Sequence, residues 1–406
     1  MSTQINSLTL KNLELDALLD ITNAINRQPD EKSLLKIFTF TLIANFKIQS
    51  ILYYELKDDK WVCTLRHGVD KEYNPHSEEL IQVLETNQFF NFNESEFKTI
   101  TNHFDFSIPL TIDNKIVSCL LLGGARKFTG EPEAIKFIQT MVNILYVAIQ
   151  NIRLTEKKIE QETLKNELII AQKLQTNLFP QTLPRRPDLK VNATYIPHQS
   201  VGGDYYDFIE MEDGDFMVSV ADVSGKGLSA AFIMSNFQAA FRVLAKQSMR
   251  LEDIVTELNS LVYNNTKGEK FITFFVARYF RNKNMIHYCN CGHNAPVLMS
   301  FDKHIQHLDK GSMILGVLPT LPFIESSKIY NVNKSVLFAY TDGLVETYEK
   351  FNTEAGEDII VNSMRESEDF DILHHQILER MKISEGAMDD ITIISCWFST
   401  ENIIEE

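Results

Sequence analysis

The chain has 406 residues, of which 44% are hydrophobic and 23% are charged, and its 39 basic and 55 acidic side chains give a net charge of −16. This composition excludes a mostly disordered or collagen-like chain, and the length predicts two to three domains. The acidic charge without a basic patch argues against nucleic-acid binding.

No apolar run reaches the roughly 18 residues that span a bilayer, and the N-terminus lacks the layout of a signal peptide. The five cysteines are scattered, which indicates a reducing compartment rather than a disulfide scaffold. We therefore expect a cytoplasmic protein with no membrane partner.

Residues 1–135 predict an α+β domain. Apolar side chains at helical spacing predict helices over 13–25 and 34–46. Strand-like runs follow at 50–56, 61–66, 105–110 and 115–123. Two helices, strands and a long exit helix resemble a GAF domain, which implies a sensor for an unknown small-molecule or protein signal.

Residues 131–178 predict one long helix, because no Pro or Gly interrupts 133–179. Roughly 50 helical residues span about 75 Å, too long to fold back within one domain. Its apolar stripe steps by three and four, with a one-residue slip in the middle: Ile138, Met141, Leu145, Ala148, Ile152, Ile159, then Leu164, Leu168, Ala171, Gln175 and Leu178. This pattern favours a coiled-coil linker over 136–178 that makes a homodimer, and the alternative is a single helix packed on its own domains.

A Pro-marked boundary at 179–187 precedes a strand-rich region that extends to residue 400. Strands are expected at 191–196, 215–223, 271–279, 285–291, 335–341 and 391–398, and helices at 229–246 and 251–264.

Four acidic clusters lie at strand ends or tight turns of this region, around Asp204, Asp222, Asp342 and Asp389. A carboxylate at the end of a core strand is partly desolvated and needs a counter-charge. Lys226 alone cannot neutralise four such groups. An all-oxygen set favours Mg²⁺ or Mn²⁺ over Zn²⁺, and two such ions would activate a water for attack on a phosphoryl group.

The clusters and their order resemble the metal-dependent type 2C protein serine/threonine phosphatases (the PPM family), in their bacterial SpoIIE/RsbU branch. The resemblance covers about 171–398 and rests on these motifs: Ala171-Gln172-Lys173-Leu174-Gln175 with Leu178-Phe179-Pro180, Gly202-Gly203-Asp204-Tyr205-Tyr206-Asp207, Asp222-Val223-Ser224-Gly225-Lys226-Gly227, Asn290-Cys291-Gly292-His293-Asn294-Ala295-Pro296, Tyr340-Thr341-Asp342-Gly343 and Asp389-Asp390-Ile391-Thr392. It implies an α/β/β/α sandwich of two antiparallel sheets over 179–400, with two metal ions in a cleft at one edge.

The resemblance also implies roles for single residues. Asp222 is placed as the ligand that both ions share, with the Val223 carbonyl beside it, and Asp204, Asp342 and Asp389 as further ligands; Asp222 and Asp342 are the expected catalytic pair. The roles of Asp207, Asp390, Asn290 and His293 stay open, although Asp390 is expected behind the ligands and Asp207 in a structural role. Cys291 departs from the usual Ala of the branch, and we locate no Arg that would clamp the substrate phosphate.

A zinc site is the competing interpretation of His287, Cys289, Cys291 and His293. Their side chains share one face of the predicted strand, but alternate residues lie in a row about 6–7 Å apart and cannot surround one ion. We expect His293 and Asn290 to brace a loop near the cleft instead.

These patterns predict a signal-regulated, metal-dependent protein serine/threonine phosphatase. The resemblance implies a phosphorylated STAS-domain antagonist of an anti-sigma factor as substrate, in a partner-switching pathway. The alternative is a catalytically silent scaffold that binds a partner, which retention of all four acidic positions disfavours. A sensor histidine kinase is excluded, because the long helix has no phospho-acceptor His and no Gly-rich nucleotide-binding boxes follow.

Overall fold

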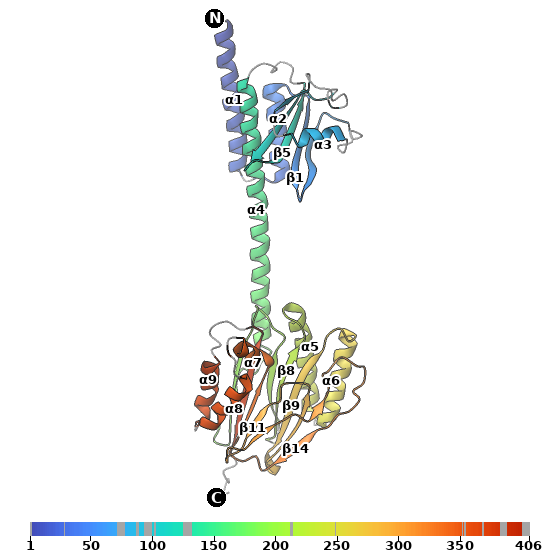
Figure 1. Cartoon of the computed structure of the whole chain (residues 1–406), viewed down its shortest axis with the longest axis vertical. Helices are drawn as coiled ribbons and strands as arrows, with labels where there is room; N and C mark the ends of the chain where they lie inside the picture. Colours follow the sequence, from blue (N-terminus) through green and yellow to red (C-terminus); the bar gives the residue numbers. More distant parts are fainter. Residues whose placement is uncertain are drawn as a thin grey trace. The chain divides into compact units, whose positions relative to one another are not determined.

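The computed structural model describes residues 2–27, 29–70, 78–86, 89–92, 100, 103–124, 132–211, 214–247, 249–350, 352, 355–367, 369–381 and 388–399. They form two compact units, Met1–Thr163 and Leu164–Glu406. Helix α4 (Pro132–Thr176) begins in the first unit and ends in the second (Figure 1). The predicted long helix is thus present, and Glu131 lies outside the described residues.

The first unit consists of helices packed on one antiparallel sheet. Its elements are α1 (Ser2–Asn26), α2 (Glu31–Phe46), β1 (Ser50–Lys57), β2 (Lys60–His67), α3 (Glu78–Leu84), β3 (Phe90–Asn91), β4 (Phe106–Ile112), β5 (Lys115–Gly123) and the first part of α4. The strand order is β2-β1-β5-β4-β3. This arrangement confirms the predicted α+β class and all four predicted strands.

Strand alternation gives this sheet two apolar faces. Ile51 and Tyr53 pack with α1, α2 and α4, whereas Leu52 and Tyr54 pack with α3 on the other side. Successive side chains of a strand point to opposite faces, so a run of apolar residues in β1 serves both cores. Asp30 caps α2 by accepting a hydrogen bond from the Ser33 backbone N–H at 2.7 Å.

The apolar stripe of α4 is divided between two uses. Ile138, Met141, Leu145 and Ala148 lie in the core of their own unit, so they do not form the seam with a second chain that the spacing suggested. A different set of large apolar side chains on α4 is exposed: Val147, Leu154, Ile159, Leu164, Ile169, Ile170 and Leu174.

The second unit contains two sheets and five helices besides the end of α4, counted over the described residues. Its elements are β6 (Leu189–Ile196), β7 (Tyr205–Glu210), β8 (Phe216–Val223), α5 (Leu228–Lys246), α6 (Leu251–Thr266), β9 (Ile272–Phe280), η3 (Arg281–Lys283), β10 (Met285–Cys291), β11 (Val297–Met299), β12 (Ile305–His307), β13 (Gly311–Ser312), β14 (Ser327–Tyr330), β15 (Ser335–Tyr340), α7 (Asp342–Glu349), α8 (Gly356–Glu366), α9 (Phe370–Arg380) and β16 (Ile391–Phe398). The helices α7, α8 and α9 were not anticipated from the sequence.

One sheet has the order β13-β10-β9-β8-β7, with β14 also paired to β10, and the other has the order β12-β11-β15-β16-β6. All pairs are antiparallel except the two-residue contact between β10 and β13, which is parallel. The prediction of two antiparallel sheets is correct apart from this short pair.

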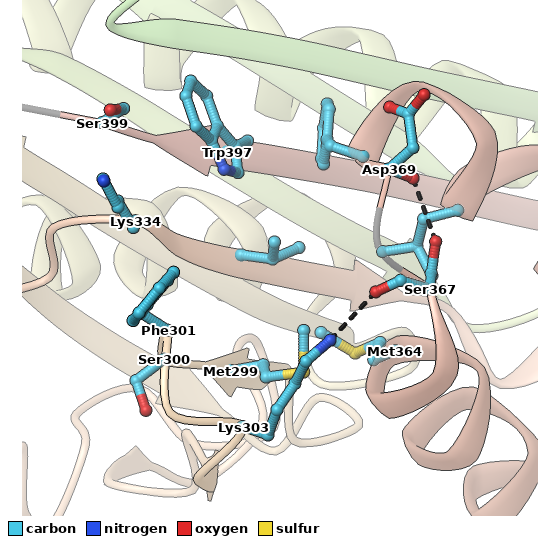
Figure 2. Close-up of a pocket in the computed structure, with 13 residues that line it drawn as sticks. Met299, Ser300, Phe301, Lys303, Lys334, Met364, Ser367, Asp369, Trp397 and Ser399 are labelled. Carbon is cyan, nitrogen blue, oxygen red and sulfur yellow. Dashed lines mark hydrogen bonds between the residues drawn. The ribbon is translucent and has the colours of Figure 1, made fainter.

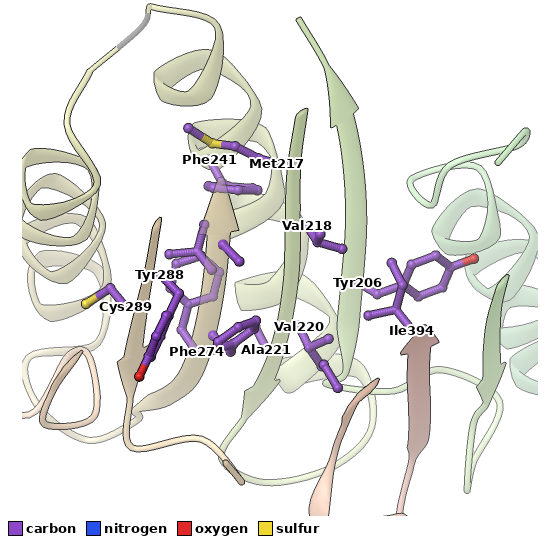
Figure 3. Packing of buried hydrophobic residues seen from close by; sticks show 14 of the residues in the cluster. Tyr206, Met217, Val218, Val220, Ala221, Phe241, Phe274, Tyr288, Cys289 and Ile394 are labelled. Atoms are coloured by element: carbon purple, nitrogen blue, oxygen red, sulfur yellow. The ribbon is translucent and has the colours of Figure 1, made fainter. Parts of the chain in front are cut away.

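The two sheets pack on each other, and helices cover their outer faces (Figure 1). Helices α5 and α6 cover the sheet of β7–β10, and α7, α8 and α9 cover the sheet of β15 and β16. Figure 3 shows the larger cluster, in which Phe241 of α5 lies edge-on against Phe274 of β9 at a ring distance of 5.4 Å. The predicted four-layer sandwich is confirmed.

Helix α5 also has features of a membrane-spanning helix. Of the described helices it alone is long and apolar enough to cross a membrane by length and composition. Ala230, Met234, Phe237 and Phe241 of this helix lie in the core of the unit, and a core helix passes the same test.

Candidate active site

The segment before β7 brings Asp204 into the interior. Asp204 is buried, and its Oδ2 accepts a hydrogen bond from the Thr341 hydroxyl at 2.7 Å. The two preceding glycines permit this approach. A Cβ on Gly202 would lie 2.2 Å from Asp390 Oδ2, and one on Gly203 would lie 2.8 Å from the Val223 carbonyl oxygen. The Gly-Gly-Asp motif is therefore required by close packing.

Asp222 lies at the end of β8, directly before a turn. In the antiparallel register Asp222 faces Thr273 of β9. The turn passes through Gly225 and Gly227, whose φ angles of +93° and +74° are in the region that favours glycine. The chain then enters α5, which packs against β7 and β8.

Asp342 and Asp389 come from the second sheet. Asp342 is the first residue of α7, directly after β15, and Asp389 precedes β16. A Cβ on Gly343 would lie 2.1 Å from the Asp390 carbonyl oxygen, so the start of α7 and the segment before β16 are in tight contact. Strand ends from both sheets thus deliver the four predicted carboxylates to one edge of the sandwich.

These carboxylates influence one another electrostatically. Burial raises the pKa of Asp204 well above its usual range, and the negative charge of Asp222 raises it further. Burial, and then the charges of Asp342 and Asp389, raise the pKa of Asp222 to about 7. Burial and the charge of Asp389 also raise the pKa of Asp342. The site concentrates negative charge without matching positive charge.

One cation partly offsets this charge. Lys226, in the turn after β8, lies with its Nζ 2.8 Å from Asp389 Oδ2 and donates to the Met388 carbonyl oxygen at 3.0 Å. Asp389 pulls the pKa of the Lys226 ammonium upward. A single lysine against four carboxylates leaves most of the repulsion in place.

The donor chemistry fits divalent cations. All four side chains offer carboxylate oxygen, which suits Mg²⁺ and Mn²⁺. Over the described residues, no three acidic, His or Cys side chains are gathered closely enough to hold an ion as they stand. Neighbouring carboxylates nevertheless contribute to the raised pKa values of Asp204, Asp222 and Asp342. A bound cation would relieve this repulsion.

Asp207 has a different environment from the four carboxylates, although it lies on β7 only three residues after Asp204. It is fully buried, and Arg242 of α5 binds both of its oxygens, at 2.7 and 3.0 Å. The Tyr205 hydroxyl and the Phe208 backbone N–H donate to the same carboxylate. Asp207 is therefore paired with a cation within the fold, and these contacts are compatible with the structural role expected for it.

Asp390 supports the ligand loop from behind. Its Oδ1 accepts from the His198 backbone N–H at 2.8 Å, and its Oδ2 accepts from that of Gly203 at 2.7 Å. These two bonds fix the segment that carries Asp204. Its expected position behind the ligands agrees with these contacts.

The end of α4 supports the same loop, which sequence reasoning missed. Gln175 is buried; its Nε2 donates to the Gly202 carbonyl oxygen at 2.7 Å, and its Oε1 accepts from the Gly202 backbone N–H at 3.2 Å. The stripe pattern assigned Gln175 to a helix seam. Two signals pointed elsewhere: Gln175 is polar at an apolar stripe position, and it belongs to the 171–175 motif of the resemblance.

His293 and Asn290 brace a loop beside Asp222, as expected. Asn290 donates to the His293 carbonyl oxygen and accepts from its backbone N–H, at 3.0 and 2.8 Å. The His293 Nδ1 lies 2.8 Å from the hydroxyl of Thr273, the residue opposite Asp222, and burial lowers the His293 pKa to about 4.

The other side chains of the zinc interpretation have separate contacts. His287 Nε2 lies 2.7 Å from the Ser326 hydroxyl, and the sulfurs of Cys289 and Cys291 lie 3.9 Å apart.

A cavity of about 450 Å³ lies elsewhere in this unit (Figure 2). Phe301, Trp397 and Met364 line it, and Lys303 crosses its edge to donate to the Ser367 carbonyl oxygen at 3.0 Å. None of the predicted site residues lines this cavity.

Comparison with known proteins agrees with this geometry. Residues 212–398 match the Stage II sporulation protein E (SpoIIE) family, a range that includes Asp222, Asp342 and Asp389 and begins after Asp204. The chain is 28% identical over 193 residues to phosphoserine phosphatase RsbU of Bacillus subtilis (strain 168), covering 47% of this chain and 57% of the relative. It is 26% identical over 187 residues to phosphoserine phosphatase RsbP of the same organism, covering 45% of this chain and 46% of the relative.

The chain spans about half the length of these curated relatives. Among solved structures, the SiaA-PP2C domain of Pseudomonas aeruginosa shares the fold, with a TM-score of 0.51 at 17% identity, covering 59% of this chain and 99% of that domain. Part of the second unit, residues 212–398, is therefore similar in sequence to the SpoIIE family, and the unit shares its fold with a PP2C domain.

Proposed function

We propose that the chain is a signal-regulated, metal-dependent protein serine/threonine phosphatase. The observation that carries this proposal is that Asp204, Asp222, Asp342 and Asp389 raise pKa values within their group, with only part of their charge offset by Lys226, in a unit similar to the SpoIIE family. Repulsion of this kind is costly to a fold and is expected where a cation or a reacting group compensates it.

In this proposal two Mn²⁺ or Mg²⁺ ions are held by Asp204, Asp222, the Val223 carbonyl, Asp342 and Asp389, and Asp222 serves both. Such ions supply a water of lowered pKa and neutralise charge on the phosphoryl group. The protein's own contribution is to hold these oxygens in place. Thr341 orients the Asp204 carboxylate, Asp390 and Gln175 fix the loop before it, and Lys226 accompanies Asp389.

The substrate we propose is a phosphorylated protein, a STAS-domain antagonist in a partner-switching pathway. The similarity to the phosphoserine phosphatases RsbU and RsbP supports a phosphoserine substrate class. We further propose that the protein acts in the cytoplasm.

We propose that 1–135 form a GAF-like sensor, that 136–178 form a dimerising linker, and that 179–400 form the phosphatase. The exposed apolar side chains of α4, among them Leu154 and Leu164, support a second copy of this chain as the partner of the linker. The Gln175–Gly202 contact supports a route by which the helix influences the ligand loop.

A turnover assay with the full chain tests the proposal. A phosphoserine protein should be dephosphorylated in Mn²⁺ or Mg²⁺ and not after chelation, and Mn²⁺ should raise the melting temperature, because a ligand that binds only the folded state stabilises it. Activity that survives exhaustive chelation would contradict the metal requirement. A chain that neither turns over substrate nor responds to Mn²⁺ would instead be a silent scaffold.

Light scattering tests the linker separately. Leu154→Lys with Leu164→Lys places charge in the proposed seam and should yield a monomer. Lysine at the exposed Phe301, which is far from α4 in sequence, is the matched control and should leave the assembly unchanged.

A further inference from the structure

The turn that follows Asp222 lies near two lysines, and over the described residues Lys226 alone of the two has an anionic partner. Lys226 is part of the turn and is paired with Asp389 at 2.8 Å. Lys270 comes from the segment before β9, and its ammonium lies beside the turn.

Lys270 lies very close to Gly225. A Cβ placed on Gly225 would be 2.3 Å from Lys270 Nζ, and Gly225 has a φ of +93°. The positive φ favours glycine at this position, and the short distance places the Lys270 ammonium directly against the turn. The half-buried Lys270 side chain is therefore packed on the active-site turn.

The backbone on both sides of Lys270 is anchored. The Phe271 N–H donates to Ser224 Oγ at 2.9 Å, and the Ser224 N–H donates to the Phe271 carbonyl oxygen at 2.9 Å. The Thr266 hydroxyl donates to the Lys270 carbonyl oxygen at 3.0 Å. These bonds hold the backbone of Lys270 next to the turn.

Within the described part of the chain, the Lys270 ammonium has no ion pair and no hydrogen bond. Two arginines of this unit, by contrast, are paired with buried carboxylates, Arg242 with Asp207 and Arg278 with Asp215. The Lys270 ammonium is therefore available to an anion, and it lies beside the turn that follows Asp222.

We propose that Lys270 binds an anionic group of the substrate at the active-site turn. The group is either the phosphoryl oxygens or a carboxylate beside the phosphorylated residue, since both are oxyanions that an ammonium recognises. This inference rests on the proposed phosphatase function and deepens it, because it supplies the positive charge that no arginine was found to provide.

The test uses the full chain with Mn²⁺ and three substrates: para-nitrophenyl phosphate, a phosphoserine peptide with flanking Glu, and the same peptide with flanking Gln. Lys270→Gln should raise KM about tenfold, the loss of one charge-assisted contact, while kcat changes less than about twofold. Lys270→Arg should restore KM. Lys246→Gln, the same charge change at the exposed end of α5, should behave as the parent.

The three substrates separate the two sources of the anion. A contact with the phosphoryl group raises KM for all three, whereas a contact with a neighbouring carboxylate raises it only for the Glu-flanked peptide. Either increase should shrink at high salt, because screening weakens the attraction. A purely structural role would instead lower the melting temperature and show no salt dependence.

A parent-like KM of Lys270→Gln on all three substrates would overturn the inference while leaving the phosphatase assignment intact. Equal effects of Lys270→Gln and Lys246→Gln would also overturn it, because general surface charge would then explain the change. If the parent turns over none of the substrates, the proposed function fails first, and the role of Lys270 fails with it.

Discussion

Asp204 and Asp207 are three residues apart on one strand end, both buried, and yet they have opposite surroundings. Asp207 is bound on both oxygens by Arg242 and by further donors from its own strand. Asp204 accepts a hydrogen bond from the Thr341 hydroxyl, and the negative charge of Asp222 raises its pKa. A buried carboxylate that is paired with a cation can be held within a fold, whereas one without a cation indicates a site at which another charge is expected to bind.

The largest effect is expected for a substitution in the carboxylate group that contains Asp204 and Asp222. Asp222→Asn should lower turnover about 1,000-fold, because the shared ligand loses its charge. The metal-free variant should be at least as stable as the parent, since removal of one carboxylate relieves repulsion with Asp342 and Asp389. Turnover and thermal melts with and without Mn²⁺ check both. Parent-like turnover would remove Asp222 from the catalytic assignment.

A substitution in the Asp207–Arg242 pair, whose charges compensate each other, should change the free energy of unfolding rather than turnover. Arg242→Met leaves the Asp207 carboxylate buried without its cation and should cost about 3 kcal/mol of unfolding free energy. The double variant with Asp207→Asn removes both charges and should recover much of the loss. Urea unfolding measures the cycle. A Mn²⁺-dependent melting shift that disappeared in Arg242→Met would show that the pair also serves the metal site.

A buried histidine, His374, makes the stability of the fold depend on pH. His374 of α9 lies between the hydroxyls of Thr194 and Ser395, and burial lowers its pKa to about 4. The unfolded chain binds this proton near pH 6.5 and the folded chain only near pH 4, so stability is lost as pH falls through that window, by about 2 kcal/mol at pH 5. The raised pKa values of Asp204 and Asp222 act in the opposite direction, because the folded chain gains their protons first.

His374→Gln should therefore be less sensitive to acid than the parent between pH 7 and pH 5. Urea unfolding of both proteins at several pH values, without metal, gives the difference that belongs to this residue. Parallel curves for parent and variant would show that His374 titrates normally in the fold.

The smallest effect is expected where α4 meets the ligand loop. Gln175→Ala removes two bonds to the Gly202 backbone and should lower kcat about tenfold by loosening Asp204. Gln172→Ala, one turn earlier on the same helix, is the control. Steady-state kinetics with saturating Mn²⁺ checks the difference, and equal kcat values in the two variants would deny the loop a role in transmitting a signal.

The sequence by itself determined the elements and the acidic positions. Alternation in β1 and the uninterrupted run of α4 are local patterns, and local patterns follow from side-chain periodicity. The order of the motifs around Asp204, Asp222, Asp342 and Asp389 is also sufficient to suggest a phosphatase. These features can be predicted from the sequence because each is encoded within a few neighbouring residues.

Only the tertiary structure decided which charges meet. The pairing of Asp207 with Arg242, of Gly202 with Gln175, and of Gly225 with Lys270 joins residues that are 27 to 45 positions apart. The same structure showed that the apolar positions Leu145 and Ala148 of α4 serve their own core rather than a partner. The pattern of an apolar stripe does not identify the surface that covers it, and the position of a carboxylate does not identify the group that neutralises it. Both depend on elements that folding brings from elsewhere in the chain.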